Sequence, residues 1–197
     1  MNVEQFSLRG YAGYETHLSE QPDEVLTQVG PETPCGEYLR RFWHPVYLTN
    51  DLCDIPVALK ILGEELVLFR DLSGTLGLVN KRCSHRLASL EYGKCEENGI
   101  RCCYHGWHFD TDGTLLDAPG QPENLNERLK RRIKLGAYPV AEYKGLIFCY
   151  MGPMAEMPEF PVFDAMEFEK MEMVPYKAPF RCNWLQVLDA ILDPLHT

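Results

Sequence analysis

The middle of the chain consists of short apolar runs that are separated by glycine turns. Val57–Leu62 and Glu65–Arg70 flank Gly63-Glu64, a two-residue hairpin signal. Ser73-Gly74 marks the next turn, before a further run at Thr75–Asn80. Short strands joined in this way at roughly ten-residue spacing predict an all-β sandwich or barrel.

The same pattern continues in the second half of the chain. Lys144-Gly145 separates two strand-like runs, Tyr138–Glu142 and Leu146–Met151. Asp110–Gly113 predicts a hairpin turn, because it lacks the later carboxylates of a calcium loop. The composition around Pro119–Asn126 predicts an irregular loop.

The two ends of the chain differ from this middle part. Pro34–Trp43 predicts a short helix that Thr33 caps, and the proline-rich segment Met151–Pro161 predicts a linker. Arg181–Leu192 has apolar residues at helical spacing and is followed by Asp193-Pro194. We therefore expect a β domain between a short N-terminal segment and a helical continuation.

Composition narrows the class of protein. The chain has 197 residues, of which 45% are apolar and 24% charged, so we expect one full globular domain and part of a second. Its formal net charge of −10 disfavours nucleic acid as a partner. The longest apolar stretch, Leu146–Met151, is too short for a membrane span, and the N-terminal sequence lacks the pattern of a signal peptide. These features predict a cytoplasmic protein.

Cysteine and histidine are concentrated in one region. The chain has eight cysteines, and in a reducing compartment metal or redox chemistry is a better expectation than disulfides. Two thiol–imidazole pairs stand out, Cys83-Ser-His85 and Cys102-Cys-Tyr-His105, which sixteen residues separate. This donor set suits zinc or an iron–sulfur cluster, and two loops with one Cys and one His each match a [2Fe–2S] cluster with two Cys and two His ligands.

These motifs resemble the cluster loops of the Rieske [2Fe–2S] domains of aromatic ring-hydroxylating oxygenases. The resemblance implies a mainly β fold, an antiparallel Rieske β-sandwich with a cluster-binding subdomain, followed by the start of an α+β catalytic domain. It also implies that the cluster ligands are Cys83, His85, Cys102 and His105. Ser84 and Cys103 stand where proline is frequent in the family, and neither change removes a ligand.

Several neighbours of the motifs have two interpretations each. A zinc site with the same donors is the alternative to the cluster, although zinc fingers do not usually have His-Gly-Trp after the last ligand. Arg86 either holds charge near the cluster or is a solvated side chain, and Trp107 shields the cluster and packs in the core. Cys103 and His108 are expected to face away from the cluster. We expect the remaining thiols to be inert, namely Cys35, Cys53, Cys95, Cys149 and Cys182.

A second group of candidate residues lies at the C-terminal end. Asp193-Pro-Leu-His196 taken alone predicts a helix end with a capping histidine. After a Rieske domain, it resembles the start of the mononuclear iron site of these oxygenases. The resemblance implies that His196 is the first Fe(2+) ligand and that Asp193 relays electrons between the two metal centres, with Asp189 either supporting Asp193 or facing solvent. The rest of the iron site is absent from the chain, so the sequence is expected to be a fragment or to have a further remainder.

The resemblance covers Thr27–Thr197 and is strongest to the N-terminal part of phthalate-dioxygenase-like oxygenase α-subunits. It implies an oxidoreductase that uses O2 for hydroxylation or O-demethylation of an aromatic substrate. Its partners would be an NAD(P)H-dependent reductase with flavin and an iron–sulfur centre, and further copies of the chain, often in a trimer. The predicted divisions are 1–43 (N-terminal segment), 44–153 (Rieske domain) and 154–197 (linker and truncated catalytic domain). The alternative is a Rieske-ferredoxin-type electron carrier without its own catalytic iron.

One basic segment is unusual for an acidic chain. Five of the seven residues from 128 to 134 are cationic: Arg128, Lys130, Arg131, Arg132 and Lys134. This segment is either a docking surface for the acidic face of a redox partner or a solvated strand edge that charge protects from pairing.

Overall fold

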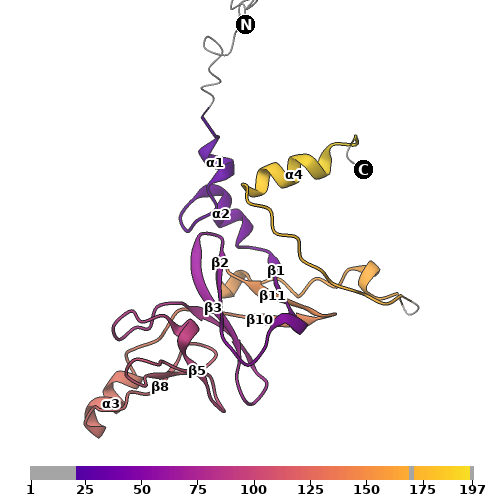
Figure 1. Ribbon diagram of the computed structural model, residues 1–197. Coiled ribbons are helices and arrows are strands. Elements are labelled where there is room, and N and C mark those ends of the chain that lie inside the picture. Colours follow the sequence, from indigo (N-terminus) through magenta and orange to yellow (C-terminus); the bar gives the residue numbers. More distant parts are fainter. Residues whose placement is uncertain (1–20, 169–170, 196–197) are drawn as a thin grey trace, which may run out of the picture.

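The computed structural model describes residues 21–168 and 171–195, and its strands form three antiparallel sheets (Figure 1). The first sheet has the order β1 (Trp43–Leu48), β11 (Leu146–Tyr150), β10 (Val140–Tyr143). The second has the order β2 (Val57–Ile61), β3 (Glu64–Arg70), β4 (Leu76–Asn80), β9 (Ala137–Tyr138). The third has the order β5 (Lys94–Cys95), β6 (Ile100–Arg101), β7 (His108–Phe109), β8 (Leu115–Asp117). The predicted antiparallel β architecture is confirmed.

Helices lie at the ends of the chain and beside the third sheet. The α-helices are α1 (Glu24–Thr27), α2 (Pro34–Leu39), α3 (Glu123–Lys130) and α4 (Trp184–Leu192). Short 3-10 helices cover Thr49–Asp51, Leu90–Tyr92, Met154–Glu156 and Asp164–Met166. No helix among the described residues is long and apolar enough to cross a membrane.

The second sheet is the central layer because strand β3 is buried on both faces. Val67 and Phe69 pack in one core cluster with residues of the third sheet, whereas Leu66 and Leu68 pack in another with β11 of the first sheet. Successive side chains of a strand point to opposite faces, so one continuous apolar run joins two cores. This double burial fixes the third sheet and its loops against the rest of the fold.

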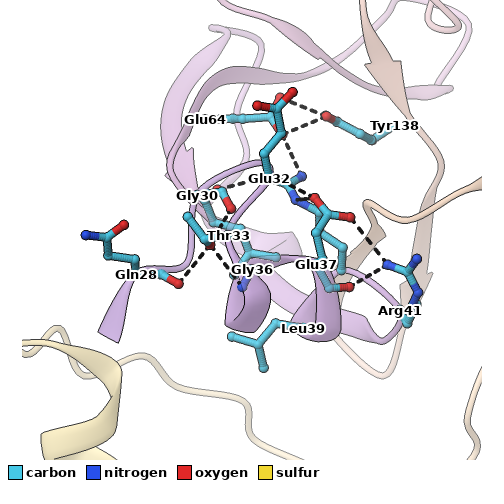
Figure 2. Close-up of polar contacts among 12 residues, drawn as sticks. Gln28, Gly30, Glu32, Thr33, Gly36, Glu37, Leu39, Arg41, Glu64 and Tyr138 are labelled. Carbon is cyan, nitrogen blue, oxygen red and sulfur yellow. Dashed lines mark hydrogen bonds and ion pairs between the residues drawn. The ribbon is translucent and has the colours of Figure 1, made fainter. Parts of the chain in front are cut away.

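Helix α2 is attached to the β2–β3 hairpin by a buried arginine. Arg40, which is 5% exposed, donates to Glu64 at 2.6 Å and to the Leu62 carbonyl at 2.9 Å. Glu64 also accepts a bond from the Tyr138 hydroxyl of β9, and the Thr33 side chain caps α2 at the Gly36 amide (Figure 2). The third guanidinium nitrogen, Nε, has no hydrogen-bond partner and lies 3.8 Å from the Glu37 carboxylate. The two bonds that Arg40 does make fix one relative position of helix and hairpin.

The segment that the sequence predicts to be a linker packs on the first sheet. The Phe160 ring contacts the rings of Trp43, Tyr143 and Phe148, with centroids 5.4, 5.6 and 5.0 Å away. The Trp43 indole N–H also donates to the Pro158 carbonyl. The segment has little regular structure, but aromatic packing holds it against the sheet.

Four local predictions were wrong in detail. The predicted helix Pro34–Trp43 ends at Leu39, since Trp43 already pairs with Tyr150 in a strand. The β2–β3 turn consists of Leu62 and Gly63, one residue earlier than predicted, because both adopt positive φ.

The other two corrections concern longer segments. The predicted loop at Pro119–Asn126 contains the start of helix α3. The predicted strand Tyr138–Glu142 is divided at Pro139, which has no N–H to donate, so β9 pairs with β4 and β10 pairs with β11.

Asp71 joins the central sheet to the third sheet. Its carboxylate accepts hydrogen bonds from the Ser73 hydroxyl at 2.6 Å, from the Thr75 amide at 2.8 Å and from the Gly99 amide at 3.0 Å. Burial alone would raise the pKa of Asp71, but these hydrogen bonds outweigh it and hold the pKa below 3.8.

We expect Asp71→Asn to lower the free energy of unfolding by about 1–3 kcal/mol at pH 7, because a charged acceptor of three bonds is lost. A depressed carboxyl pKa stabilises the fold above the unfolded-state pKa and loses that contribution as the pH falls. Urea unfolding should therefore show the difference between parent and variant shrinking below about pH 4. Exposed Glu97 lies in the β5–β6 turn, and Glu97→Gln is the matched control. Equal stability of Asp71→Asn and parent at pH 7 would contradict this role.

Candidate metal centre

Two loops carry the predicted cluster ligands, one between β4 and β5 and one between β6 and β7, and both close by the same pattern of backbone hydrogen bonds. In the first loop, the Cys83 amide donates to the Ala88 carbonyl and the Leu87 amide donates to the Cys83 carbonyl. In the second loop, the Cys102 amide donates to the Trp107 carbonyl and the Gly106 amide donates to the Cys102 carbonyl. Each loop is thus a closed six-residue unit that begins at a cysteine.

Each loop turns at its fifth residue through a positive φ. The angle is 58° at Leu87 and 75° at Gly106. Glycine adopts this conformation without strain, whereas a leucine there is uncommon. A Cβ atom at position 106 would also lie 2.9 Å from Pro119 Cγ, so the second loop has a steric reason for glycine.

The four predicted donors form two pairs. The Cys83 and Cys102 side chains, 1% and 4% exposed, lie buried beside each other. The His85 and His105 rings lie nearer the surface, with centroids 4.7 Å apart and planes at 70°. Within residues 21–168 and 171–195, no three His, Cys, Asp or Glu side chains are arranged to hold one metal ion.

The electrostatics of the site suit metal ligation. Burial and the neighbouring Cys102 together raise the pKa of the Cys83 thiol to about 11, although the backbone amides of His85 and Arg86 favour the thiolate. A metal ion replaces the thiol proton, and amides directed at the sulfur then stabilise its negative charge. Burial and the neighbouring His105 lower the pKa of His85, which favours the neutral, ligating imidazole. The residues therefore fit a cluster with two thiolate and two imidazole ligands.

Aromatic rings cover the imidazole pair. The Trp107 ring stacks on His85, with centroids 4.6 Å apart and planes at 4°, and it is 4% exposed. The Tyr104 ring lies against His105 at 3.8 Å, while its own side chain is 60% exposed. Trp107 therefore packs in the core, as predicted, and stacks on one of the predicted ligand rings; that it shields the cluster from water stays a prediction.

Other residues singled out in the sequence lie at the edge of the site or away from it. Arg86 and Cys103 are exposed. His108 contacts the Asn98 carbonyl and Arg101 through its two ring nitrogens. Asp110–Gly113 forms the predicted turn, since the Gly113 amide donates to the Asp110 carbonyl. The cysteines that were expected to be inert carry free thiols, with Cys35 half-buried, Cys95 and Cys149 buried, and Cys53 and Cys182 exposed.

Sequence reasoning missed the polar group behind the second loop. Arg101 contacts Glu96, Asp117 and the Gly106 carbonyl. Arg101 directly precedes Cys102, which is a local signal, but its carboxylate partners lie five and sixteen residues away and have no motif.

The second predicted group lies at the opposite end of the chain. Asp193 is the C-cap of α4 and accepts a hydrogen bond from the Leu195 amide at 2.9 Å. Asp189 is exposed one turn earlier, and His196 lies outside the described residues. Figure 1 shows α4 far from α3, β5 and β8, so Asp193 and the two cluster loops do not meet within one chain.

The fold and the paired loops define an iron–sulfur domain with mixed thiol and imidazole donors. The sequence pattern of the Rieske [2Fe-2S] domain family matches residues 42–144, and the chain belongs to this family. The predicted [2Fe–2S] cofactor is thereby confirmed.

Two similar relatives are oxygenase subunits. The chain is 51% identical to the tert-butanol monooxygenase / tert-amyl alcohol desaturase oxygenase subunit of Aquincola tertiaricarbonis, over 95% of this chain and 40% of that protein. It is 44% identical to the phenoxybenzoate dioxygenase subunit alpha of Ectopseudomonas oleovorans, over 91% of this chain and 47% of that protein. The resemblance to Rieske oxygenase subunits is confirmed.

A solved structure agrees. The complex between oxygenase and ferredoxin of carbazole 1,9a-dioxygenase matches with a TM-score of 0.68 at 29% identity, over 87% of this chain and 42% of that chain. The present chain thus spans less than half the length of these three proteins.

Proposed function

We propose that this chain is the electron-accepting part of a Rieske non-haem iron oxygenase. In this proposal Cys83 and Cys102 hold one iron of the [2Fe–2S] cluster, and His85 and His105 hold the other. The observation that carries it is the pairing of buried thiols beneath two adjacent imidazole rings, in loops that close by one hydrogen-bond pattern. When bound, the cluster transfers single electrons and a mononuclear iron activates O2.

The domain division follows from this assignment. We propose residues 1–43 as an N-terminal segment, 44–153 as the Rieske domain and 154–197 as the link to a catalytic domain. The β1–β11 pairing supports a domain that begins near Trp43, and Arg40 supports a close attachment of the preceding helix. We also propose a cytoplasmic location, as the sequence indicates.

We propose that Asp193 connects the two metal centres and that His196 binds the mononuclear iron. A carboxylate at the end of α4 is able to accept a hydrogen bond from an iron-bound imidazole and so fix its orientation. Since α4 lies far from α3, β5 and β8 in the folded molecule, this relay needs the cluster of a second copy (Figure 1). The geometry therefore favours the homo-oligomer, often a trimer, that the family resemblance implies.

The substrate class rests on the relatives. A phenoxybenzoate dioxygenase supports an aromatic substrate, whereas a tert-butanol monooxygenase supports a small tertiary alcohol. We propose the aromatic class, with hydroxylation or O-demethylation as the reaction. Substrate-dependent O2 uptake by the complete oxygenase, with an aryl carboxylate, an aryl ether and tert-butanol as probes, distinguishes these classes.

A surface for the redox partner accompanies the cluster. Residues 81–134 hold ten of the nineteen Lys and Arg residues, although the whole chain has a net charge of −10. Arg128, Arg131 and Arg132 are exposed and make no ion pair with the described residues, while Lys130 and Lys134 pair with Glu127 and Asp112. Residues 128–130 end helix α3 and a turn follows, so the interpretation as a strand edge was wrong for them. Only Lys134, at the end of the segment, forms a β-bridge, with Thr114.

We propose that this surface receives the acidic face of an electron donor. The carbazole oxygenase–ferredoxin complex supports an iron–sulfur partner, and the family resemblance implies an NAD(P)H-dependent reductase with flavin and iron–sulfur centres. The alternative function, a Rieske-ferredoxin-type carrier, is less favoured because these two relatives are oxygenase subunits and their similarity covers 95% and 91% of this chain.

The cluster assignment predicts a red-brown protein with about two irons and two sulfides per chain. We expect Cys102→Ser to lose the cluster, because an alcohol does not replace the thiolate. Cys103→Ser changes the adjacent, exposed cysteine, and this variant should retain the cluster. Iron and sulfide analysis with visible absorption measures both variants. A colourless parent protein with one zinc would overturn the assignment.

The relay predicts that Asp193→Asn, in the complete oxygenase, lowers turnover by about 10–100-fold while both metal centres stay loaded. The substitution keeps the size of the side chain and removes its charge. Single-turnover oxidation of the cluster, with substrate and O2 present, should slow in parallel. Asp189→Asn, one turn earlier and exposed, is the control. Loss of mononuclear iron in Asp193→Asn would instead indicate a ligand or structural role.

The docking surface predicts that Arg131→Glu/Arg132→Glu slows reduction by the reductase about tenfold at low salt, and that the difference shrinks as salt is added. Lys60→Glu/Arg181→Glu makes the same charge change on exposed residues elsewhere. Stopped-flow reduction at several ionic strengths measures the effect. An unchanged rate and salt dependence in the first variant would show that docking occurs elsewhere.

A further inference from the structure

Arg101 joins the second cluster loop to the protein around it. It ends strand β6, directly before Cys102. Its Nη1 donates to the Gly106 carbonyl at 2.8 Å, one residue after His105. The guanidinium is half-buried, so the Gly106 carbonyl is held by a fixed side chain and not by mobile water.

Two carboxylates hold this guanidinium in place. Glu96 accepts from Arg101 Nε at 2.9 Å and from Nη2 at 3.0 Å, which is a bidentate pair. Asp117 accepts from Nη1 at 3.4 Å, and the His108 Nδ1 atom lies 3.3 Å from Nη2. A guanidinium in such a fork has one orientation, because rotation would break several bonds at once.

The contacts continue from Asp117 to helix α3. The Asn126 side chain donates to Asp117 Oδ1 at 3.0 Å and accepts from the Ala118 amide at 3.0 Å. Arg128 follows two residues later on the same helix and belongs to the proposed docking surface. A continuous series of polar contacts therefore leads from that helix to the carbonyl beside His105.

The first loop has no such support. Among the described residues, no side chain donates to the Leu87 carbonyl, which is the equivalent position. In the first loop, the His85 ring is instead stacked on Trp107, whereas the exposed His105 ring has Tyr104 beside it. The second loop is therefore the one whose ligand geometry depends on an external tether.

The charges of the group support a permanent interaction. The hydrogen bonds from Arg101 lower the pKa of Glu96, and bonds from Asn126 and Arg101 lower the pKa of Asp117. The same contacts raise the pKa of Arg101. All three groups are thus ionised at neutral pH, with Lys94 and His108 as the other titratable groups that face Glu96.

We propose that Arg101 is a positioning residue for the cluster: it fixes the Gly106 carbonyl, and through it the orientation of His105, so that the second loop presents its imidazole in one geometry. This inference rests on the ligand assignment proposed above. Removal of the guanidinium would free the Gly106–Trp107 peptide and leave two carboxylates without their cation near the cluster. Added negative charge disfavours the reduced cluster, and a loosened ligand changes its electronic structure.

The test compares Arg101→Gln and Arg101→Lys in the cluster-loaded protein. We expect Arg101→Gln to lower the equilibrium constant for reduction about tenfold, which is 59 mV for one electron, and to shift the EPR g values of the reduced cluster. Arg101→Lys keeps the positive charge but loses the bidentate hydrogen bonds of the guanidinium. Its reduction potential should therefore lie close to that of the parent, while its g values are still shifted. Redox titration followed by EPR and visible circular dichroism gives both readouts without turnover.

Arg70 provides a matched control. It also donates to a turn carbonyl, Gly74, at 3.0 Å and to a carboxylate, Glu142, at 2.7 Å, but it lies in the central sheet. Arg70→Gln should leave potential and g values as in the parent. If Arg101→Gln prevents folding, Arg101→Lys and Asp117→Asn carry the test through their g values.

The outcomes separate this inference from the proposed function. Parent-like g values in Arg101→Lys would mean that Arg101 acts by charge alone, which overturns the positioning role, and an unchanged Arg101→Gln variant overturns it as well. A parent protein that binds no [2Fe–2S] cluster contradicts the ligand assignment itself.

Discussion

Two backbone loops must bury a pair of thiols and hold a pair of imidazole rings at the surface, and the rest of the structure depends on this constraint. Each loop begins at Cys83 or Cys102, closes within six residues by backbone hydrogen bonds and turns at a residue with positive φ. In this arrangement the cysteine faces inward and the histidine faces outward. Burial makes an isolated thiolate unfavourable. Free thiolates at this site would therefore be unfavourable, whereas thiolates bound to a metal would be stabilised.

Sheet packing decides where these loops lie. Strand β3 is buried on both faces, so the central sheet carries the cluster subdomain on one side and the first sheet on the other. Arg40 fixes α2 on the central hairpin. Helix α4 lies against α1 at the same end of the molecule, since the Trp184 indole N–H donates to the Leu26 carbonyl. Figure 1 shows α4 far from α3, β5 and β8, so under the proposed relay Asp193 would receive electrons from the cluster of a second copy. Oligomerisation is thus a geometric requirement of the proposed activity.

The distribution of charge fits the same division. Cations concentrate in residues 81–134 of an otherwise acidic chain, around the region where electrons would enter. Arg101 serves a different purpose from the exposed arginines of the surface, because it is paired and half-buried, and it holds a backbone carbonyl. In the two proposals, the exposed arginines would steer a partner, whereas the paired Arg101 would fix a ligand loop.

The sequence by itself determined the β fold, the cofactor and the four candidate ligands, because each cluster loop is a local unit whose hydrogen bonds close within six residues. Only the tertiary structure revealed helix α3, whose N-cap is Pro122 without a capping side chain, and the division of one predicted strand at Pro139. It also revealed the contacts of Arg101 with Glu96 and Asp117 and the packing of Phe160 on the first sheet. Those features depend on which distant segments meet, and that is decided by burial of both faces of β3, a long-range effect that no local pattern encodes.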